Sequence, residues 1–530
     1  MRLSLLPSLF SLAVAATNAT FQQTCANAIS TLQLPNTTIW TSTFIPAGTN
    51  LTFPETNATC TRTPQVIRAD FCRITMYVST SNRSGISMEA WLPSSWTGRF
   101  LSTGNGGLQG CIQYIDMAYA SGLGFATVGA NGGHNGTSGG AFYNNEDIVI
   151  DFAWRSVHTN VLIGKEVTKQ FYGEQHKKSF YLGCSTGGRQ GMKSVQMFPN
   201  DFDGVVVGAP AVAFNNLTSW SGKFFLETGT NTSLTFVTAA QWAAIGADVM
   251  AQCDTLDGVK DGIIEDPSLC HYRPENLLCQ NTTTTTTTTN KTSTCLTPTQ
   301  ATTVRQIFSP FYGPTGDLIY PRMQPGSELL GAIGLLYGGI PFPYTTDWFR
   351  YAVYNDPTWQ PSHLTNTDID YAYTKNAGNV QSWVGDLSPF HAAGGKLLHY
   401  HGLADQVISS ENSPRYYDFV KETMGLRSEQ LDEWYRYFRI SGMAHCSGGP
   451  GAWEIGQSAG FATEEAGGNV LMALVRWVEG GVAPETVTGV KYVNDTRSLG
   501  VLMERRHCRW PRRNTYLGGD AGKADSWGCE

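Results

Sequence analysis

The segment 179–198 constrains the fold most, because it places a short apolar strand, a glycine-rich turn and a helix in immediate succession. Residues 179–183 read as a buried strand, and a helix follows from the turn to about Phe198. The turn itself, GCSTG, matches the pattern G-x-S-x-G with Ser185 at its centre. Side chains two residues to either side of so sharp a turn would clash, so glycines are expected there. The pattern predicts that Ser185 stands exposed at the carboxyl edge of a sheet.

Strand and helix signals alternate on both sides of a long interruption. Before it, we predict two β-rich runs within 71–92, strands at 99–103, 124–130 and 204–208, and an amphipathic helix at 151–172 with Asp151 near its start. After it, we predict strands at 396–402 and 434–440 and helices at about 411–424 and 470–479. Between 211 and 390 the chain is rich in Thr, Asn, Pro and aromatic residues. This alternation predicts an α/β fold, a mostly parallel sheet with helices on both faces.

An acid and a base for Ser185 are expected further along the chain, in the order serine, acid, histidine. Asp405 follows the predicted strand 396–402, and His445 follows the predicted strand 434–440. Site residues gather in loops after the carboxyl ends of parallel strands. The competing residues are weaker candidates. Asp418 lies inside a helix, Asp432 precedes a strand, and a structural role is favoured for the remaining four: His399 and His401, in or at the end of a buried strand, and His158 and His507.

These three residues predict acyl transfer by a serine nucleophile. Ser185 attacks an acyl carbonyl, His445 takes and returns the proton, and Asp405 orients and stabilises the imidazolium. Two backbone N–H groups are needed for the oxyanion, and we expect them from Thr186 and from Gly106 or Gly107 in the glycine-rich loop after the strand 99–103. An ordinary tight turn is the alternative reading of that loop.

The domain organisation follows from the motif and the interruption. We expect residues 17–210 and 391–530 to form one catalytic domain with the α/β-hydrolase fold. Residues 211–390 form a lid domain, inserted after the strand that follows the Ser185 helix. Eight consecutive threonines, residues 282–289, predict a low-complexity loop within this insertion.

The first residues and the cysteines indicate an oxidising compartment. Residues 1–16 combine Arg2, an apolar run and the A-x-A site Ala13-Val14-Ala15, which predicts a secretory signal peptide; a buried N-terminal helix is the alternative. Twelve cysteines then favour disulfides. Proximity suggests Cys253–Cys270, Cys279–Cys295 and Cys508–Cys529, and leaves Cys25, Cys60, Cys72 and Cys111 unassigned. Cys184 precedes Ser185 and Cys446 follows His445, so a bond between them would clamp nucleophile and base together.

Charge and glycosylation signals agree with secretion. The formal net charge of −7 and the absence of a basic patch argue against nucleic acid as a partner. After the signal peptide, no apolar stretch reaches the roughly 20 residues that span a bilayer. Charged residues make up only 15% of the chain, and N-glycans on surface loops would supply solubility. The N-x-S/T sequons are Asn18, Asn36, Asn50, Asn57, Asn82, Asn135, Asn216, Asn231, Asn281, Asn290 and Asn494.

The insertion also holds an acidic loop, CDTLDGVKDGIIEDP at residues 253–267. Asp254, Asp257 and Asp261 alternate with glycines that let the loop curl around a hard cation. Ligation by oxygen alone suits structural Ca²⁺. The spacing by itself supports a solvated acidic turn equally well.

Several of these segments resemble the fungal tannase and feruloyl esterase family. The resemblance rests on GCSTGGRQG, HGLAD and GMAHC, and on STGNGGLQGC, FATVGANGGHNG and HCRWP, and it covers nearly the whole mature chain. It implies the triad Ser185, Asp405 and His445 with a Cys184–Cys446 disulfide. It also implies a structural Ca²⁺ site on Asp254, Asp257 and Asp261 with the carbonyls of Val259 and Ile263. The other pairs implied are Cys25–Cys72, Cys60–Cys111, Cys253–Cys270, Cys279–Cys295 and Cys508–Cys529.

Within that family the chain looks most like feruloyl esterases of type B. The resemblance then implies a secreted, extracellular serine carboxylesterase that hydrolyses feruloyl, coumaroyl and caffeoyl esters, as small aromatic esters or feruloylated oligosaccharides of plant cell walls. The alternative is a tannase acting on galloyl esters. Fungal tannases are often processed at a dibasic site in the lid, and no Lys-Arg or Arg-Arg pair lies between residues 211 and 390. A hydrolase-fold binding protein without activity is a third reading, disfavoured because all three triad members are present.

The sequence does not determine which aromatic residues of the insertion line the acyl pocket. Candidates that could line it, or equally form the core of the insertion, are Tyr337, Phe342, Trp348, Phe349 and Tyr351.

Overall fold

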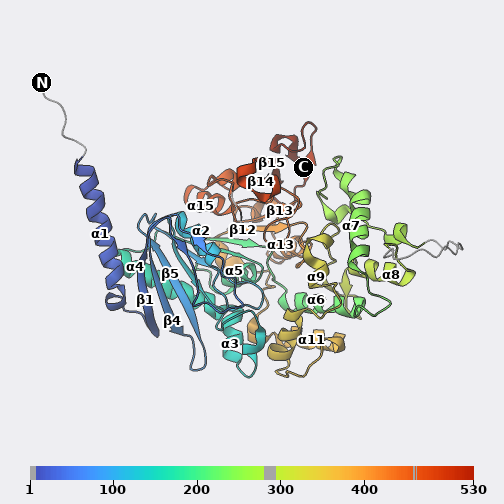
Figure 1. The fold of residues 1–530 in the computed structure, drawn as a ribbon, viewed down its shortest axis with the longest axis horizontal. Coiled ribbons are helices and arrows are strands. Elements are labelled where there is room, and N and C mark those ends of the chain that lie inside the picture. Colours follow the sequence, from blue (N-terminus) through green and yellow to red (C-terminus); the bar gives the residue numbers. More distant parts are fainter. Residues whose placement is uncertain (1–7, 280–293, 458–459, 461) are drawn as a thin grey trace.

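The computed structural model describes the chain except for residues 1–7, 280–293, 458–459 and 461. A nine-stranded sheet organises it, in the order β1-β4-β5-β7-β6-β8-β9-β12-β13 (Figure 1). The strands are β1 (Thr37–Ile45), β4 (Phe71–Ser79), β5 (Gly85–Pro93), β6 (Arg99–Thr103), β7 (Ala126–Ala130), β8 (Lys178–Cys184), β9 (Gly204–Gly208), β12 (Lys396–Gly402) and β13 (Tyr435–Ile440). The mixed α/β class expected from the alternation of signals is confirmed.

The sheet is parallel only in part. Strands β7, β6, β8, β9, β12 and β13 run parallel to one another. Strands β1, β4 and β5 add an antiparallel edge, paired through β5 to β7. The sequence pattern did not predict β1, whose alternating exposure reflects its place at the sheet edge. The two β-rich runs in 71–92 pair antiparallel because only residues 80–84 join them.

Helices cover both faces of the sheet, as the alternation predicts. On one face, α4 (Ser156–Tyr172), α5 (Thr186–Met197) and α13 (Asn412–Thr423) share a core with β4, β5 and β7. On the other, α2 (Tyr114–Gly122) and α15 (Val470–Gly480) pack on β6, β8 and β12. The position of Asp151 is a correction. The helix begins earlier, as α3 (Glu146–Ile150), and continues through a π-helical turn, so Asp151 is buried inside it and pairs with Arg155 at 2.5 Å.

The described residues of 211–390, which leave out 280–293, contribute no strand to the main sheet. They form a short β10–β11 pair (Phe311–Tyr312 and Leu318–Tyr320) and helices, which are α6 (Phe214–Thr228), α7 (Ala239–Cys253), α8 (Pro298–Ile307), α9 (Ile333–Leu335), α10 (Pro343–Asp347), α11 (Asn366–Lys375) and α12 (Ser388–Ala392). Figure 1 shows α6, α7, α8, α9 and α11 gathered on the side of the molecule opposite β1 and β4. Most of the buried apolar side chains of this segment share one aromatic-rich core. The threonine run and the sequons Asn281 and Asn290 lie outside the described residues.

Further helices and strands precede and follow the strands of the main sheet in the sequence. At the start, α1 (Ser8–Thr31) buries Cys25 and Ala28, and the small pair β2–β3 (Asn50–Leu51 and Gln65–Val66) follows β1. The first turns of α1 extend away from the rest of the molecule (Figure 1). After α15 come two antiparallel pairs, β14–β15 (Thr486–Tyr492 and Val501–Cys508) and β16–β17 (Asn514–Tyr516 and Trp527–Cys529). A four-residue helix, α14 (Ser428–Leu431), precedes β13.

Six disulfides join the twelve cysteines, and they are the six pairs that the family resemblance implies. They are Cys25–Cys72, Cys60–Cys111, Cys184–Cys446, Cys253–Cys270, Cys279–Cys295 and Cys508–Cys529. The first ties α1 to the antiparallel edge of the sheet, and the last ties β15 to β17. Cys184–Cys446 bridges residues 262 apart in sequence, with a Cα–Cα distance of 6.0 Å.

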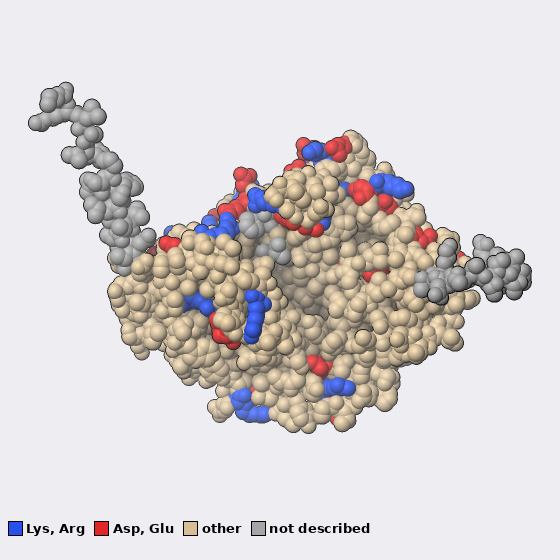
Figure 2. Space-filling model, viewed as in Figure 1, with Lys and Arg blue, Asp and Glu red and all other residues tan. Residues whose placement is uncertain are grey.

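The surface carries few charged side chains. Figure 2 shows one face, on which Lys, Arg, Asp and Glu form small scattered groups around a central hollow lined mostly by uncharged residues. Among the described helices, none is both long and apolar enough to cross a bilayer.

Candidate active site

Ser185 occupies the sharp turn between β8 and α5. Its backbone is in the left-handed region, with φ +64° and ψ −122°, which costs an L-residue about 1–3 kcal/mol. Glycines make the turn possible: a Cβ on Gly183 would lie 2.8 Å from the backbone of Gly187, and a Cβ on Gly188 would lie 2.5 Å from the carbonyl oxygen of Gly208. The turn therefore presents the Ser185 hydroxyl at the amino end of a helix, whose first N–H groups point toward the same space.

Asp405 and His445 meet in the loops that follow β12 and β13. The Nδ1 atom of His445 lies 2.7 Å from Oδ2 of Asp405, and the Asp405 side chain is fully buried. His445 is held a second time by its backbone N–H, which donates to Oε1 of Gln406 at 3.0 Å. Because Nδ1 of His445 faces the carboxylate, Nε2 is the ring nitrogen left to act on a neighbouring hydroxyl.

Ser185 and His445 line one cavity of about 490 Å³. The disulfide between Cys184 and Cys446 joins their chain neighbours, so the two loops cannot separate while it is intact. In the described part of the chain, no hydrogen bond involves the Ser185 hydroxyl. Such serine–histidine bonds are often long without substrate and tighten when it binds.

The carboxylate of Asp405 accepts four hydrogen bonds. Oδ1 accepts the backbone N–H groups of Val407 and Ile408, at 2.8 and 2.9 Å. Oδ2 accepts from His445 and from Nε2 of His401, the latter at 3.0 Å. Burial alone would raise the pKa of Asp405, but the two histidines and these hydrogen bonds outweigh it and hold the pKa well below its usual range. Asp405 is therefore an anion over the whole pH range in which a histidine base operates.

The glycine-rich loop after β6 lies against the start of α5. The Thr186 hydroxyl donates to the carbonyl oxygen of Gly107 at 2.7 Å, which fixes the loop beside Ser185. Gly107 has φ +52°, and a Cβ there would lie 2.4 Å from the Tyr344 hydroxyl, so glycine is required at that position. The amides of Gly104 and Asn105 are used, by the Leu182 carbonyl and the Gln190 side chain. This leaves the N–H groups of Gly106, Gly107 and Thr186 as candidate donors, on residues that line the same cavities as Ser185.

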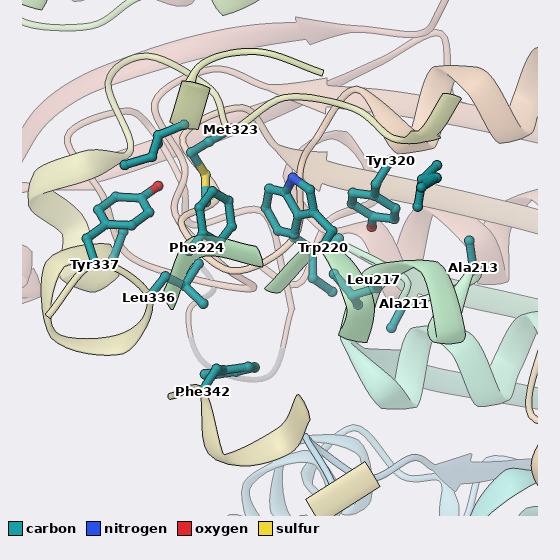
Figure 3. Close-up of a cluster of buried hydrophobic side chains, with 14 of the residues drawn as sticks. Ala211, Ala213, Leu217, Trp220, Phe224, Tyr320, Met323, Leu336, Tyr337 and Phe342 are labelled. Carbon is teal, nitrogen blue, oxygen red and sulfur yellow. The ribbon is translucent and has the colours of Figure 1, made fainter. Parts of the chain in front are cut away.

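Two cavities adjoin Ser185, with different linings. The larger one is bordered by Gly106, Gln109, Gln113 and Gln457 as well as by apolar side chains. A smaller one of about 40 Å³ lies between Ser185 and the insertion, lined by Phe214, Leu217, Thr218, Ser221, Phe342, Tyr344, Val407 and Ile408. Figure 3 shows Leu217 on α6 and Phe342 on opposite sides of an open space. The insertion thus supplies much of the apolar lining beside the serine.

The aromatic candidates of the insertion divide between pocket and core. Phe342 lines both cavities beside Ser185. Tyr337, Trp348 and Phe349 are buried in the core of the insertion. Tyr351 borders a different surface pocket, beside Phe142 and Asn145. Tyr344, which sequence reasoning did not single out, also lines both cavities, and no local signal distinguishes it from the core aromatics.

The competing acids and bases lie elsewhere, with one exception. His158 pairs with Asp201 at 2.8 Å, and His507 contacts the Ala452 carbonyl oxygen at 3.0 Å. Asp418 pairs with Lys421, and Asp432 pairs with Arg509. The exception is His401. The sequence predicts a structural role for it, because it lies at the end of a buried strand. In the structure it contacts Asp405 directly.

The acidic loop follows α7 and is tied to β15. Asp254 accepts N–H bonds from Gly262 and Ile263, and Asp261 is paired with the buried Arg505 at 2.6 Å. Among the described residues, no three His, Cys, Asp or Glu side chains converge closely enough to hold a metal ion. Yet Oδ2 of Asp257 is buried without a hydrogen-bond partner. Burial, with the nearby charge of Asp261, raises the pKa of Asp257. An orphaned carboxylate oxygen in an oxygen-only donor set fits a hard cation.

Comparison with known proteins identifies relatives along the whole chain. The family model described as "Tannase and feruloyl esterase" matches residues 72–348 and 364–530. A protein named "Probable feruloyl esterase B-2" from Neosartorya fischeri is 53% identical over 531 residues, covering 100% of this chain and 99% of that protein. The crystal structure of feruloyl esterase B from Aspergillus oryzae is 50% identical with a TM-score of 0.92, covering 96% of this chain and 100% of that one. Tannin acyl hydrolase from Aspergillus niger shares the fold at 21% identity, with a TM-score of 0.74 over 96% of this chain and 95% of that chain.

Proposed function

The chain belongs to the tannase and feruloyl esterase family and is a carboxylic ester hydrolase, and from this premise we propose that it hydrolyses hydroxycinnamate esters of plant cell-wall polysaccharides. The observation that carries the proposal is the geometry around Ser185. A strained strand–turn–helix serine and the buried Asp405–His445 pair face one cavity. The choice of acyl group rests on the feruloyl esterase B relatives, which are 50–53% identical to this chain.

The proposed reaction passes through an acyl-enzyme. The Ser185 hydroxyl attacks the ester carbonyl and gives its proton to Nε2 of His445. His445 then protonates the leaving alcohol, and afterwards activates the water that releases the acid. Asp405 keeps the proton of Nδ1 in place and stabilises the imidazolium. The N–H groups of Thr186 and Gly106 bind the oxyanion, each worth about 2.7–4 kcal/mol in the transition state.

The two cavities suggest how an ester would be placed. The apolar lining from the insertion, including Phe342 and Leu217, suits a planar aromatic acyl group. The larger cavity offers the glutamine side chains of Gln109 and Gln113 to the hydroxyls of a sugar alcohol. In this proposal residues 211–390 act as the lid domain that completes the acyl pocket.

A substrate panel tests the acyl group. With methyl ferulate, methyl caffeate, methyl p-coumarate and methyl gallate at equal concentration, we expect hydroxycinnamates to give the higher kcat/KM. A pocket built for one ring pattern discriminates by about 1–3 kcal/mol, or about 10- to 200-fold. Chromatography of the released acids measures this directly. A dominant rate on methyl gallate would instead assign the chain to the tannases.

The Cys184–Cys446 disulfide is expected to keep Ser185 and His445 in the relative position that proton transfer requires. Replacing both cysteines by alanine should lower kcat at least tenfold at a temperature where circular dichroism shows a folded protein. Closing so long a loop also stabilises the folded state by up to about 5 kcal/mol. A matched double variant, Cys508→Ala with Cys529→Ala, should lower the melting temperature without changing kcat. Full activity in the Cys184/Cys446 variant would contradict this role.

We also propose that the acidic loop binds structural Ca²⁺, through Asp254, Asp257 and Asp261 and the carbonyls of Val259 and Ile263. The ion would supply charge neutralisation for Asp257 and a cross-link within the loop, and no step of the reaction needs it. At about 100 times its Kd, Ca²⁺ would stabilise the fold by about 2.7 kcal/mol. Chelation should therefore lower the melting temperature and leave kcat at 25 °C unchanged, with recovery on adding Ca²⁺.

The calcium response has a matched control. Asp257→Asn should abolish the response to chelator, whereas Asp356→Asn, an exposed aspartate of the insertion, should retain it. An unchanged melting temperature in excess chelator, with calorimetry showing no Ca²⁺ binding to the chelated protein, would exclude the site.

We propose that the protein is secreted after removal of residues 1–16, and that it carries N-glycans. Six disulfides and the exposed positions of Asn36, Asn50, Asn57, Asn82, Asn135, Asn231 and Asn494 support this. Asn216 differs, because it is half-buried and its Nδ2 donates to the Ile319 carbonyl oxygen at 3.3 Å. A glycan on Nδ2 would have to fit at this half-buried position, so Asn216 is left out of the proposal.

A further inference from the structure

A buried chain of hydrogen bonds runs away from Asp405, on the side opposite Ser185. Nε2 of His401 lies 3.0 Å from Oδ2 of Asp405, and Nδ1 of His401 lies 2.6 Å from the Ser413 hydroxyl. The same hydroxyl lies 2.9 Å from Nε2 of His399, whose Nδ1 lies 3.0 Å from the Tyr435 hydroxyl. All five side chains are at most 2% exposed. The reaction described above uses only Asp405 from this chain.

With both histidines neutral, the positions of the atoms allow one consistent direction for the protons. Asp405 is an anion and can only accept, so Nε2 of His401 carries a hydrogen. The Ser413 hydroxyl has a single proton and lies between two ring nitrogens. If it donates to Nδ1 of His401, it accepts from Nε2–H of His399, and the Tyr435 hydroxyl donates to Nδ1 of His399. Every donor then has an acceptor, and both histidines are neutral.

Neutral histidines are also what burial requires. Burial holds the pKa of His399 well below its usual value. A second proton on His401 would reverse the Ser413 hydroxyl, which would then donate to Nε2 of His399. With both histidines neutral, the chain is an uncharged array that ends in one N–H directed at Asp405.

We propose that His401 is a positioning residue: its Nε2–H occupies Oδ2 of Asp405 beside His445 and so limits how strongly Asp405 holds the proton of His445. This inference rests on the proposed roles of Ser185, Asp405 and His445. An oxygen shared between two donors is a weaker acceptor for each. His445 therefore releases its second proton more readily, and the free base persists to lower pH.

The groups that face this chain from neighbouring elements place no further charge directly beside His445. Tyr320 of β11 approaches Asp405 from the insertion, and burial raises the pKa of its phenol, so it stays neutral. Arg415 on α13 is a cation, and the groups that interact with its charge are Tyr320, Glu411 and Tyr312 rather than Asp405 or His445. Gln406 faces His445 with an uncharged amide. The charge balance at His445 is thus set by Asp405 and by the donors on its carboxylate.

The pH dependence of kcat/KM tests the proposal. His401→Met removes the donor while keeping an apolar side chain of similar length. Asp405 then binds the His445 proton more tightly, and we expect the acid limb to move up by about 0.5–1 pH unit. His401→Gln restores an N–H donor for Asp405 and an acceptor for Ser413, and its acid limb should return to within about 0.2 unit of the wild type. KM should be nearly the same in all three.

Tyr435→Phe is the matched control, because it removes the far end of the same chain. It should lower the melting temperature, since it leaves Nδ1 of His399 unpaired, but leave the acid limb in place. A shift in Tyr435→Phe equal to that in His401→Met would show a general effect of the core and overturn the proposal. An unshifted acid limb in His401→Met would overturn it as well, while esterase activity dependent on Ser185 would still support the proposed function.

A measurement that needs no substrate keeps the two hypotheses separate. In ¹⁵N-histidine NMR of the wild type, His399 and His401 should both appear as neutral Nε2–H tautomers. The imidazolium of His445 should lose its Nε2 proton at higher pH in His401→Met. An Nδ1–H tautomer of His401 overturns the inference even if the variant fails to fold. If no ester of the panel is hydrolysed, the proposed function fails and the NMR titration alone supports or overturns the inference.

Discussion

Ser185→Ala should reduce kcat on methyl ferulate by about 10⁴- to 10⁶-fold. The residual activity would come from the oxyanion donors and substrate binding alone. The proposed covalent step has no other acceptor, because Ser185 alone stands on the strained turn between β8 and α5. KM should stay close to the wild-type value. Burst kinetics with a chromogenic ester, measured together with steady-state rates, checks whether the acyl-enzyme has disappeared.

The control for this variant is a serine on the same helix. Ser194→Ala also removes a buried hydroxyl from α5, but Ser194 lines neither cavity beside Ser185. It should keep at least half of the wild-type kcat. Because the Ser185 hydroxyl makes no hydrogen bond in the described structure, Ser185→Ala should also keep its melting temperature. Residual activity above about 1% in a preparation free of wild type would mean that another residue is the nucleophile.

Asp405→Asn should be the second most damaging single change, with kcat falling by about 10⁴-fold. The amide cannot accept from both His445 and His401 while also accepting the N–H groups of Val407 and Ile408. Nδ1 of His445 then loses its acceptor, the ring adopts the wrong tautomer, and its Nε2 can no longer take the Ser185 proton. The rate on a chromogenic ester between pH 5 and 9 measures the loss.

Asp201→Asn separates the catalytic role from a structural one. Asp201 is buried and pairs with His158 at 2.8 Å, much as Asp405 pairs with His445. It lies far from Ser185 in the fold, on the segment before β9. We expect a loss of stability in both variants and a loss of kcat only in Asp405→Asn. Equal loss of kcat in the two would show that Asp405 acts through stability.

The positions of Ser185, Asp405 and His445 followed from the sequence because each depends on local pattern. The glycines at positions 183 and 187, between a buried strand and a helix, determine the backbone conformation at Ser185. Strands whose apolar runs end directly before Asp405 and His445 place both at one edge of a parallel sheet. Proximity along the chain suggested three of the cysteine pairs, and the positions of Cys184 and Cys446 beside Ser185 and His445 suggested a fourth. Only the family resemblance implied Cys25–Cys72 and Cys60–Cys111.

What the sequence could not determine depends on contacts between distant segments. The antiparallel edge includes β1, which the sequence pattern did not predict; it lies at the end of the sheet, and Ile45 is its only buried residue. Phe342 and Tyr344 could not be told from core aromatics such as Trp348, since which of them faces Ser185 depends on how the insertion packs. His401 read as a buried strand residue. Only the tertiary structure brought Asp405, Ser413 and Tyr435 into one hydrogen-bonded chain with it, because those partners come from a loop, a helix and a neighbouring strand.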